Sequence, residues 1–113
     1  MRDERLRLAD IMEAADAIAR FVSGRTEAEF VNDSMLCSAV LYQLGIIGEA
    51  ATNLPIDFRN RHPEIPWPQI VRFRNFIVHA YFAVNWSIVW VAATKNAPEL
   101  RAQVAAILAS EFP

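Results

Sequence analysis

Residues 34–53, SMLCSAVLYQLGIIGEAATN, are apolar on nearly every side of the helix that they are expected to form. A helix without a polar face has to be surrounded, either by other helices of its own chain or by a partner chain. Ser34 is a favourable N-cap residue, and the apolar run ends near Asn53. The sequence therefore predicts a central helix over residues 34–53, against which the rest of the chain packs.

Two glycines and one carboxylate stand out within this predicted helix. Gly45 and Gly48 each cost about 1 kcal/mol of helix propensity relative to alanine, so we expect another helix to approach closely there. Glu49 is the only charged residue of the stretch, and charged side chains are rarely buried alone. We therefore expect Glu49 to lie at the edge of the core or to pair with an arginine.

Two helices are predicted before the central one. Apolar residues at three- and four-residue steps indicate an amphipathic helix over about 3–22. Thr26 and Glu29 form the pattern of a capping box, which predicts a short helix over about 26–32. Both helices can pack against the central helix over residues 34–53.

After the central helix, three prolines indicate a loop over residues 54–66. Three helical segments are predicted beyond it: a helix from Pro68 to about His79, a short helix capped by Asn85, and a last helix that begins with a second capping box at Asn96 and Glu99.

No segment alternates apolar and polar residues as a strand would, so the predicted fold is all-α. We expect an antiparallel helical bundle of four principal helices with one or two short helices, formed as a single domain over residues 1–113. The apolar fraction of 54% exceeds the usual range for a domain of this size, and a second copy would cover the excess. The sequence therefore predicts a homodimer.

Composition also limits the classes of function. Cys37 is the only cysteine, so neither an intramolecular disulfide nor a cysteine-based metal site is expected, and its helical register predicts a buried side chain. No uninterrupted apolar run approaches the ~18 residues of a membrane span, and the charged residues 1–5 do not resemble a signal peptide. We expect a soluble, cytoplasmic protein with no metal or cofactor. The net charge is −2, but residues 55–82 carry four arginines and two acids, which predicts a local basic patch.

The helix predicted to end near His79 carries the residues best suited to chemistry. Residues 74–81 read RNFIVHAY, so an arginine is followed five residues later by a histidine and then by a tyrosine. Arginine binds phosphate oxygens through two parallel hydrogen bonds, and histidine transfers protons near neutral pH. Placing both in an apolar run costs solvation energy unless they face a cleft. The stretch is therefore a candidate site.

The spacing of Arg74 and His79 leaves two arrangements open. Five residues correspond to about 7.5 Å of rise and 140° of rotation on a straight helix, whereas Asn75 and His79 share a face. Either Arg74 bends around a cleft toward His79, or a partner chain completes the set across a two-fold axis. The sequence alone does not choose between them.

These residue types suit cleavage of RNA. The 2′-hydroxyl of RNA can attack the adjacent phosphate, so the enzyme has only to move protons and stabilise charge in the transition state. The chain lacks a clustered metal box, a glycine-rich phosphate loop and a nucleophile elbow. The alternative is structural, since a histidine near a helix C-terminus satisfies carbonyl groups and an arginine pairs with a carboxylate such as Glu49.

Arg74-Asn75, His79 and Tyr81 resemble the R-x4-H-x-Y signature of the HepT-like branch of HEPN-domain proteins. Residues 46–50, IIGEA, and 63–67, PEIPW, are similar to other segments of that family, so the likeness covers about residues 35–90. The resemblance implies a small all-α homodimer that acts as the toxin of a toxin–antitoxin pair. It also implies metal-independent ribonucleolysis at the dimer interface, and silencing by a minimal nucleotidyltransferase (MNT) antitoxin that transfers AMP from ATP to the motif tyrosine.

By position, the resemblance implies that Arg74 and His79 are catalytic, that Asn75 supports them, and that Tyr81 is the site of AMPylation. An anionic nucleotide attached two residues from the histidine would occupy the cleft and repel the substrate phosphate. From the residues alone, Tyr81 would be a half-buried aromatic side chain whose hydroxyl reaches a carbonyl group.

Other cations are weaker candidates for binding RNA. Arg72 satisfies a looser spacing to the histidine, but apolar Phe73 follows it where the family has a polar residue. Arg59 and Arg61 are expected to be solvated charges and possible RNA contacts, and His62 is expected to be a surface residue.

A second hypothesis belongs to a different class of function. The chain would then be a non-catalytic helical module that binds a nucleotidyltransferase partner or a nucleotide. In that case Arg74 and His79 would be structural residues.

Overall fold

The computed structural model of the chain describes residues 3–113, and over these residues it consists of helices without a strand. The expectation of an all-α fold is confirmed. Met1 and Arg2 of the charged N-terminal segment lie outside the described residues. In chain order the elements are α1 (Glu4–Val22), α2 (Glu27–Val31), α3 (Ser34–Asn53), α4 (Ile56–Arg61), α5 (Trp67–His79), the 3₁₀ turn η1 (Tyr81–Ala83), α6 (Trp86–Val91), the π-helical segment η2 (Ala92–Asn96) and α7 (Ala97–Glu111).

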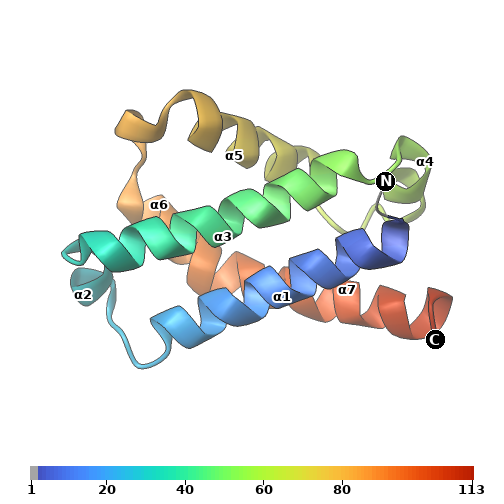
Figure 1. Cartoon of the computed structure of the whole chain (residues 1–113), viewed down its shortest axis with the longest axis horizontal. Helices are drawn as coiled ribbons and strands as arrows, with labels where there is room; N and C mark the ends of the chain where they lie inside the picture. Colours follow the sequence, from blue (N-terminus) through green and yellow to red (C-terminus); the bar gives the residue numbers. More distant parts are fainter. Residues whose placement is uncertain (1–2) are drawn as a thin grey trace.

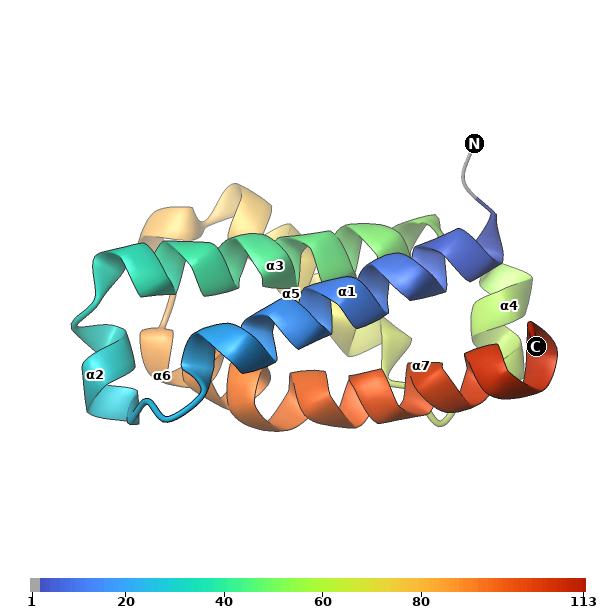
Figure 2. The same cartoon turned by 60° about the horizontal axis from the view of Figure 1, so that its bottom comes forward.

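The longer helices lie side by side with alternating directions (Figure 1). α3 packs between α1 and α5, and α1 packs on its other side against α7. Figure 2 shows α1 running between α3 and α7, with α5 behind α3. Fully buried side chains of the three core helices fill the space between them: Leu8, Ile11 and Ile18 of α1, Val40 of α3, and Val104 of α7.

α3 covers the predicted central segment and is the core helix of the chain. Its N-cap, however, is Asp33 and not Ser34, because the Asp33 carboxylate accepts the backbone N–H of Leu36 at 3.0 Å. α3 is also long and apolar enough to span a membrane by length and composition alone. In the structure α1 and α5 pack against it, which explains its hydrophobicity as that of a core helix.

The connection from α1 to α3 follows the sequence pattern closely. Gly24 adopts a φ of +73°, a conformation that suits glycine, in the turn after α1. The Thr26 hydroxyl then accepts the Glu29 N–H at 3.1 Å, and the Glu29 carboxylate accepts the Thr26 N–H at 2.9 Å. The predicted capping box is therefore confirmed, and these hydrogen bonds lower the pKa of Glu29.

The segment predicted as a loop, residues 54–66, contains the helix α4. Pro55 is its N-cap and Pro63 follows its end, so the prolines bound the helix and do not interrupt it. Phe58 is fully buried and anchors α4 to the core. His62 is also not a surface residue, since its side chain is 12% exposed and lies against Glu64 and Glu111.

The second predicted capping box is absent. Asn96 has helical φ and ψ angles of −72° and −40° and makes no capping hydrogen bond. α6, η2 and α7 follow one another without a break, so the helical run that contains Asn96 has already begun at Trp86. A cap requires an extended residue at a helix start, and this position is interior to a helix.

Candidate functional site

α5 carries the motif residues and is positioned by its apolar side. Trp67 is buried, and its indole N–H donates to the His62 carbonyl oxygen at 3.0 Å. Ile70, Phe73 and Ile77 continue at three- and four-residue steps and pack against the core. The opposite side of α5 is consequently exposed to solvent.

Arg74 is held by two neighbouring side chains. Its Nη2 donates to Oε2 of Glu49 on α3 at 2.5 Å, and its Nη1 donates to Oδ1 of Asn75 at 3.0 Å. The expected pairing of Glu49 with an arginine is thus confirmed. A guanidinium has five N–H groups, so an arginine fixed in this way keeps donors for an anion.

Gly48 explains how Arg74 comes so close to α3. A Cβ at this glycine would lie 2.2 Å from the Arg74 Cβ and 2.6 Å from its Cγ. The predicted close approach is therefore confirmed at Gly48. The prediction is wrong for Gly45 within residues 3–113, where an added Cβ meets no neighbouring helix within 4 Å.

His79 is the last residue of α5 and is exposed. The helix ends there because Ala80 leaves the helical region, with φ −139° and ψ 38°. Within residues 3–113, the His79 side chain makes no hydrogen bond or ion pair, and none joins it to Arg74. Asn75 lies four residues before His79 on the same face of α5 and accepts from Arg74, so it draws the guanidinium toward that face.

Tyr81 lies in η1, directly after the motif helix, with 43% of its surface exposed. It lines a shallow groove of about 430 Å³ with residues of α3 that include Tyr42, Gly45 and Glu49. Its ring contacts Phe82 edge to face, with 5.6 Å between the ring centres. Tyr81 is therefore accessible and close to the residue that holds Arg74.

The other arginines named from the sequence lie elsewhere. Arg72 is exposed on α5. Arg59 and Arg61 belong to α4, at the opposite end of the molecule from the end of α5 (Figure 1). Arg61 lies 3.2 Å from a carboxylate oxygen of Glu111, so it belongs to an ion-pair network at that end. The structure does not bring the α4 arginines to the motif.

The described residues contain no group of three or more histidine, cysteine, aspartate or glutamate side chains that could hold a metal ion. The donors near Arg74 are a single carboxylate and a single amide. The arrangement can bind an anion through Arg74 and exchange a proton at His79. A supporting role for Asn75 was expected from the sequence, and the bond from Arg74 to Asn75 is a contact between adjacent side chains, which no helical period reports.

Known proteins that are similar to this chain carry ribonuclease names. The family described as "Ribonuclease HepT-like" matches residues 11–107. A protein of Caldanaerobacter subterraneus named "Putative RNase" is 39% identical over 111 residues, covering 98% of this chain and 99% of the relative. "Probable ribonuclease HepT" of Thermococcus cleftensis is 39% identical over 94 residues, covering 83% of this chain and 86% of the relative. A "Putative RNase" of Methanocaldococcus jannaschii is 34% identical over 103 residues, covering 91% and 94% of the two chains.

No solved structure matches the chain. The family match covers most of the sequence, including the central helix, the motif and η1. The chain therefore belongs to the HepT-like ribonuclease family.

Proposed function

We propose that this protein is the toxin of a toxin–antitoxin system and a metal-independent endoribonuclease, with Arg74 and His79 as its catalytic residues. Membership of the HepT-like ribonuclease family supports RNA as the substrate. The observation that carries the proposal is the guanidinium of Arg74, which Glu49 and Asn75 hold near one face of α5. The same face bears His79, whose exposed side chain has no partner among residues 3–113.

In the proposed reaction, His79 takes the proton from the ribose 2′-hydroxyl or gives one to the leaving 5′-oxygen. Arg74 stabilises the charge that develops on the phosphate oxygens, and its fixed position lowers the cost of reorganisation. Asn75 keeps the guanidinium directed toward the histidine face. Arg72, Arg59 and Arg61 are at most contacts for flanking phosphates.

We further propose that two copies form a homodimer of antiparallel four-helix bundles through one stripe of α3. The stripe consists of residues spaced at helical intervals on a single face: Met35, Ser38, Tyr42, Gly45 and Glu49. Met35 and Tyr42 are 81% and 69% exposed, and Gly45, the next residue of the stripe after Tyr42, has open space above it among the described residues. A second copy on this stripe would bring two sets of motif residues to one cleft.

The proposed antitoxin is an MNT-type nucleotidyltransferase, with both proteins in the cytoplasm. The Tyr81 hydroxyl would attack the α-phosphorus of ATP, release pyrophosphate and lose its proton to solvent, leaving AMP on the tyrosine. The exposure of Tyr81 in the groove beside Glu49 supports this role. The attached phosphate would then compete with the RNA phosphate for Arg74.

Purified protein incubated with cellular RNA in EDTA tests the nuclease. Wild type should cleave, and His79→Ala and Arg74→Ala should not, while circular dichroism reports an unchanged fold. Arg72→Ala is the matched control, because it removes an exposed arginine of the same helix and should retain kcat. If both motif variants cut like wild type, the chain is a non-catalytic helical module with structural Arg74 and His79.

Mass spectrometry after incubation with the MNT protein and ATP tests the modification. One AMP should be added, and Tyr81→Phe should abolish the addition. Tyr42→Phe is the control, because Tyr42 is an exposed tyrosine that lines the same groove. Labelling that persists in Tyr81→Phe removes the proposed role of Tyr81.

A further inference from the structure

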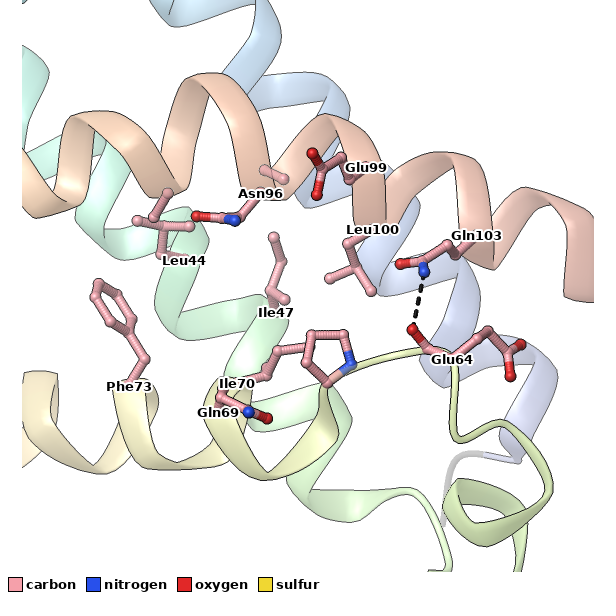
Figure 3. A pocket seen from close by; sticks show the side chains of 13 residues that line it. Leu44, Ile47, Glu64, Gln69, Ile70, Phe73, Asn96, Glu99, Leu100 and Gln103 are labelled. Carbon is pink, nitrogen blue, oxygen red and sulfur yellow. Dashed lines mark hydrogen bonds between the residues drawn. The ribbon is translucent and has the colours of Figure 1, made fainter.

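A second groove lies between α5 and the segment formed by η2 and α7, with α3 as its floor (Figure 3). Its volume is about 520 Å³. α5 packs mainly against α3, and α7 packs mainly against α1, so the side of α5 that faces α7 remains open. The large apolar side chains of the lining come from three helices: Leu44, Ile47, Ile70, Phe73 and Leu100.

This groove is separate from the motif. Leu44 and Ile47 of α3 line it, whereas Gly45 and Glu49 line the shallow groove next to Tyr81. The two grooves therefore lie on opposite sides of the contact between α3 and α5.

The polar side chains around the groove are acidic or neutral. Glu64 and Glu99 contribute carboxylates, and no lysine, arginine or histidine is among the lining residues. Gln103 donates to the backbone carbonyl oxygen of Glu64 at 3.1 Å and closes one end. Over residues 3–113, the Glu99 side chain makes no hydrogen bond or ion pair, and Figure 3 shows it beside Asn96 along the α7 side.

The π-helical segment η2 forms the other end of the groove. Ala92 and Asn96, its first and last residues, both line the cavity. Single π turns within helices occur frequently at functional sites, because they widen the helix and redirect side chains. The π-helical segment thus forms part of the wall of the groove.

The charge around this groove determines which partner it fits. Two carboxylates at the edge of an apolar surface repel phosphate groups and attract a cation. The lining extends on one side from Ala92 to Gln103, which is about 16 Å or three helical turns. A helix that binds in a groove of this length presents apolar residues at i, i+3 or i+4, and i+7.

We propose that this groove binds a basic amphipathic helix of a partner protein. Apolar side chains of that helix would pack on Ile47, Phe73 and Leu100. Its lysine or arginine side chains would pair with Glu64 and Glu99. The occupant closes the open side of α5, which has only α3 as a major neighbour within its own chain.

In the test, the isotopically labelled chain of residues 1–113 is titrated with synthetic peptides, and its backbone amide signals are followed by NMR. The probe is an alanine-based helix of about fifteen residues, with leucine at i, i+3 and i+7 and lysine beside them. The signals of Gln69, Asn96 and Leu100 should shift. The same peptide with glutamate in place of lysine should leave them unchanged.

Charge-reversal variants locate the site. Glu99→Lys should weaken binding of the lysine peptide about tenfold or more, because it replaces an attraction by a repulsion. Glu13→Lys is the matched control, since Glu13 is exposed on α1 and outside the groove, and it should bind like wild type. Both positions are exposed, so folding should persist in each variant.

Three results would overturn the proposal. The first is equal binding of the lysine and glutamate peptides. The second is an affinity that Glu99→Lys does not change. The third is a shift of the same amide signals with hexylammonium but not with the lysine peptide. The groove would then be a site for small amines.

Discussion

Replacing Gly48 by alanine tests how the position of Arg74 is set. The added methyl carbon would lie 2.2 Å from the Arg74 Cβ, whereas nonbonded carbon atoms are in contact at about 3.5–4.0 Å. The Arg74 Cβ is fixed by the backbone of α5, so it cannot swing away as the end of a long side chain can. α5 must therefore move from α3 by roughly 1.5 Å, the difference between these distances.

The expected cost follows from two opposing terms. Alanine gains about 1 kcal/mol of helix propensity over glycine. Overpacking costs about 1–3 kcal/mol when a core contact can relax, and the displaced helix also strains the pair between Arg74 and Glu49. We expect a net loss of about 1–2 kcal/mol in the free energy of unfolding, which lowers Tm by several degrees for a chain of this size.

Gly45→Ala is the control on the same helix, where the methyl group meets no atom within 4 Å. In dilute protein, without self-association, it should raise the free energy of unfolding by up to about 1 kcal/mol. Thermal and urea denaturation measure both variants, and RNA cleavage in EDTA should be lower in Gly48→Ala than in wild type. If Gly48→Ala is as stable as Gly45→Ala and as active as wild type, the reasoning about this contact is refuted.

Three further predictions concern the site, the interface and the core. Glu49→Gln should change the free energy of unfolding by less than about 1 kcal/mol, because the ion pair of Arg74 with Glu49 is partly exposed. It should nevertheless lower kcat for RNA cleavage about tenfold, because Arg74 loses its fixed position. An unchanged kcat would show that Glu49 does not position Arg74. Tyr42→Arg should convert the proposed dimer to monomers, because two new positive charges would meet across the two-fold axis. Light scattering measures the mass, and a mass equal to that of wild type would place the interface elsewhere. Burial raises the pKa of the Cys37 thiol, with a smaller contribution from Asp33, so the native thiol should be alkylated slowly at pH 8 and rapidly in urea. As pH rises above about 8.5, the unfolded chain loses its thiol proton first, so stability should decline, and Cys37→Ala should remove that part of the decline; rapid native alkylation would contradict the burial.

The sequence predicted those features that depend on local chemistry or on a long periodic pattern. The bounds of α3 follow from twenty residues of apolar helix, and the Thr26 capping box follows from two residues at a fixed spacing. The same rule failed at Asn96, because an N-cap residue must itself have an extended backbone, and Asn96 is helical. Spacing cannot report that condition.

α4 was missed for a related reason. Its six residues are too few for a helical period, and they stand between prolines that are typical of a loop. What stabilises α4 is the tertiary burial of Phe58. The pairing of Glu49 was foreseen from its isolation in an apolar helix, but the choice of Arg74 required the relative position of α3 and α5.

Arg61 has a consequence for how the chain can be joined to other proteins. Its guanidinium lies 4.0 Å from Glu4, the first residue of α1, and 3.2 Å from Glu111, the last residue of α7. The start of α1 and the end of α7 therefore lie close together beside α4, away from the end of α5 (Figure 1). A fluorescent reporter or an affinity tag attached before α1 or after α7 would therefore project from the α4 end of the molecule. Neither attachment would cover the surface around Tyr81.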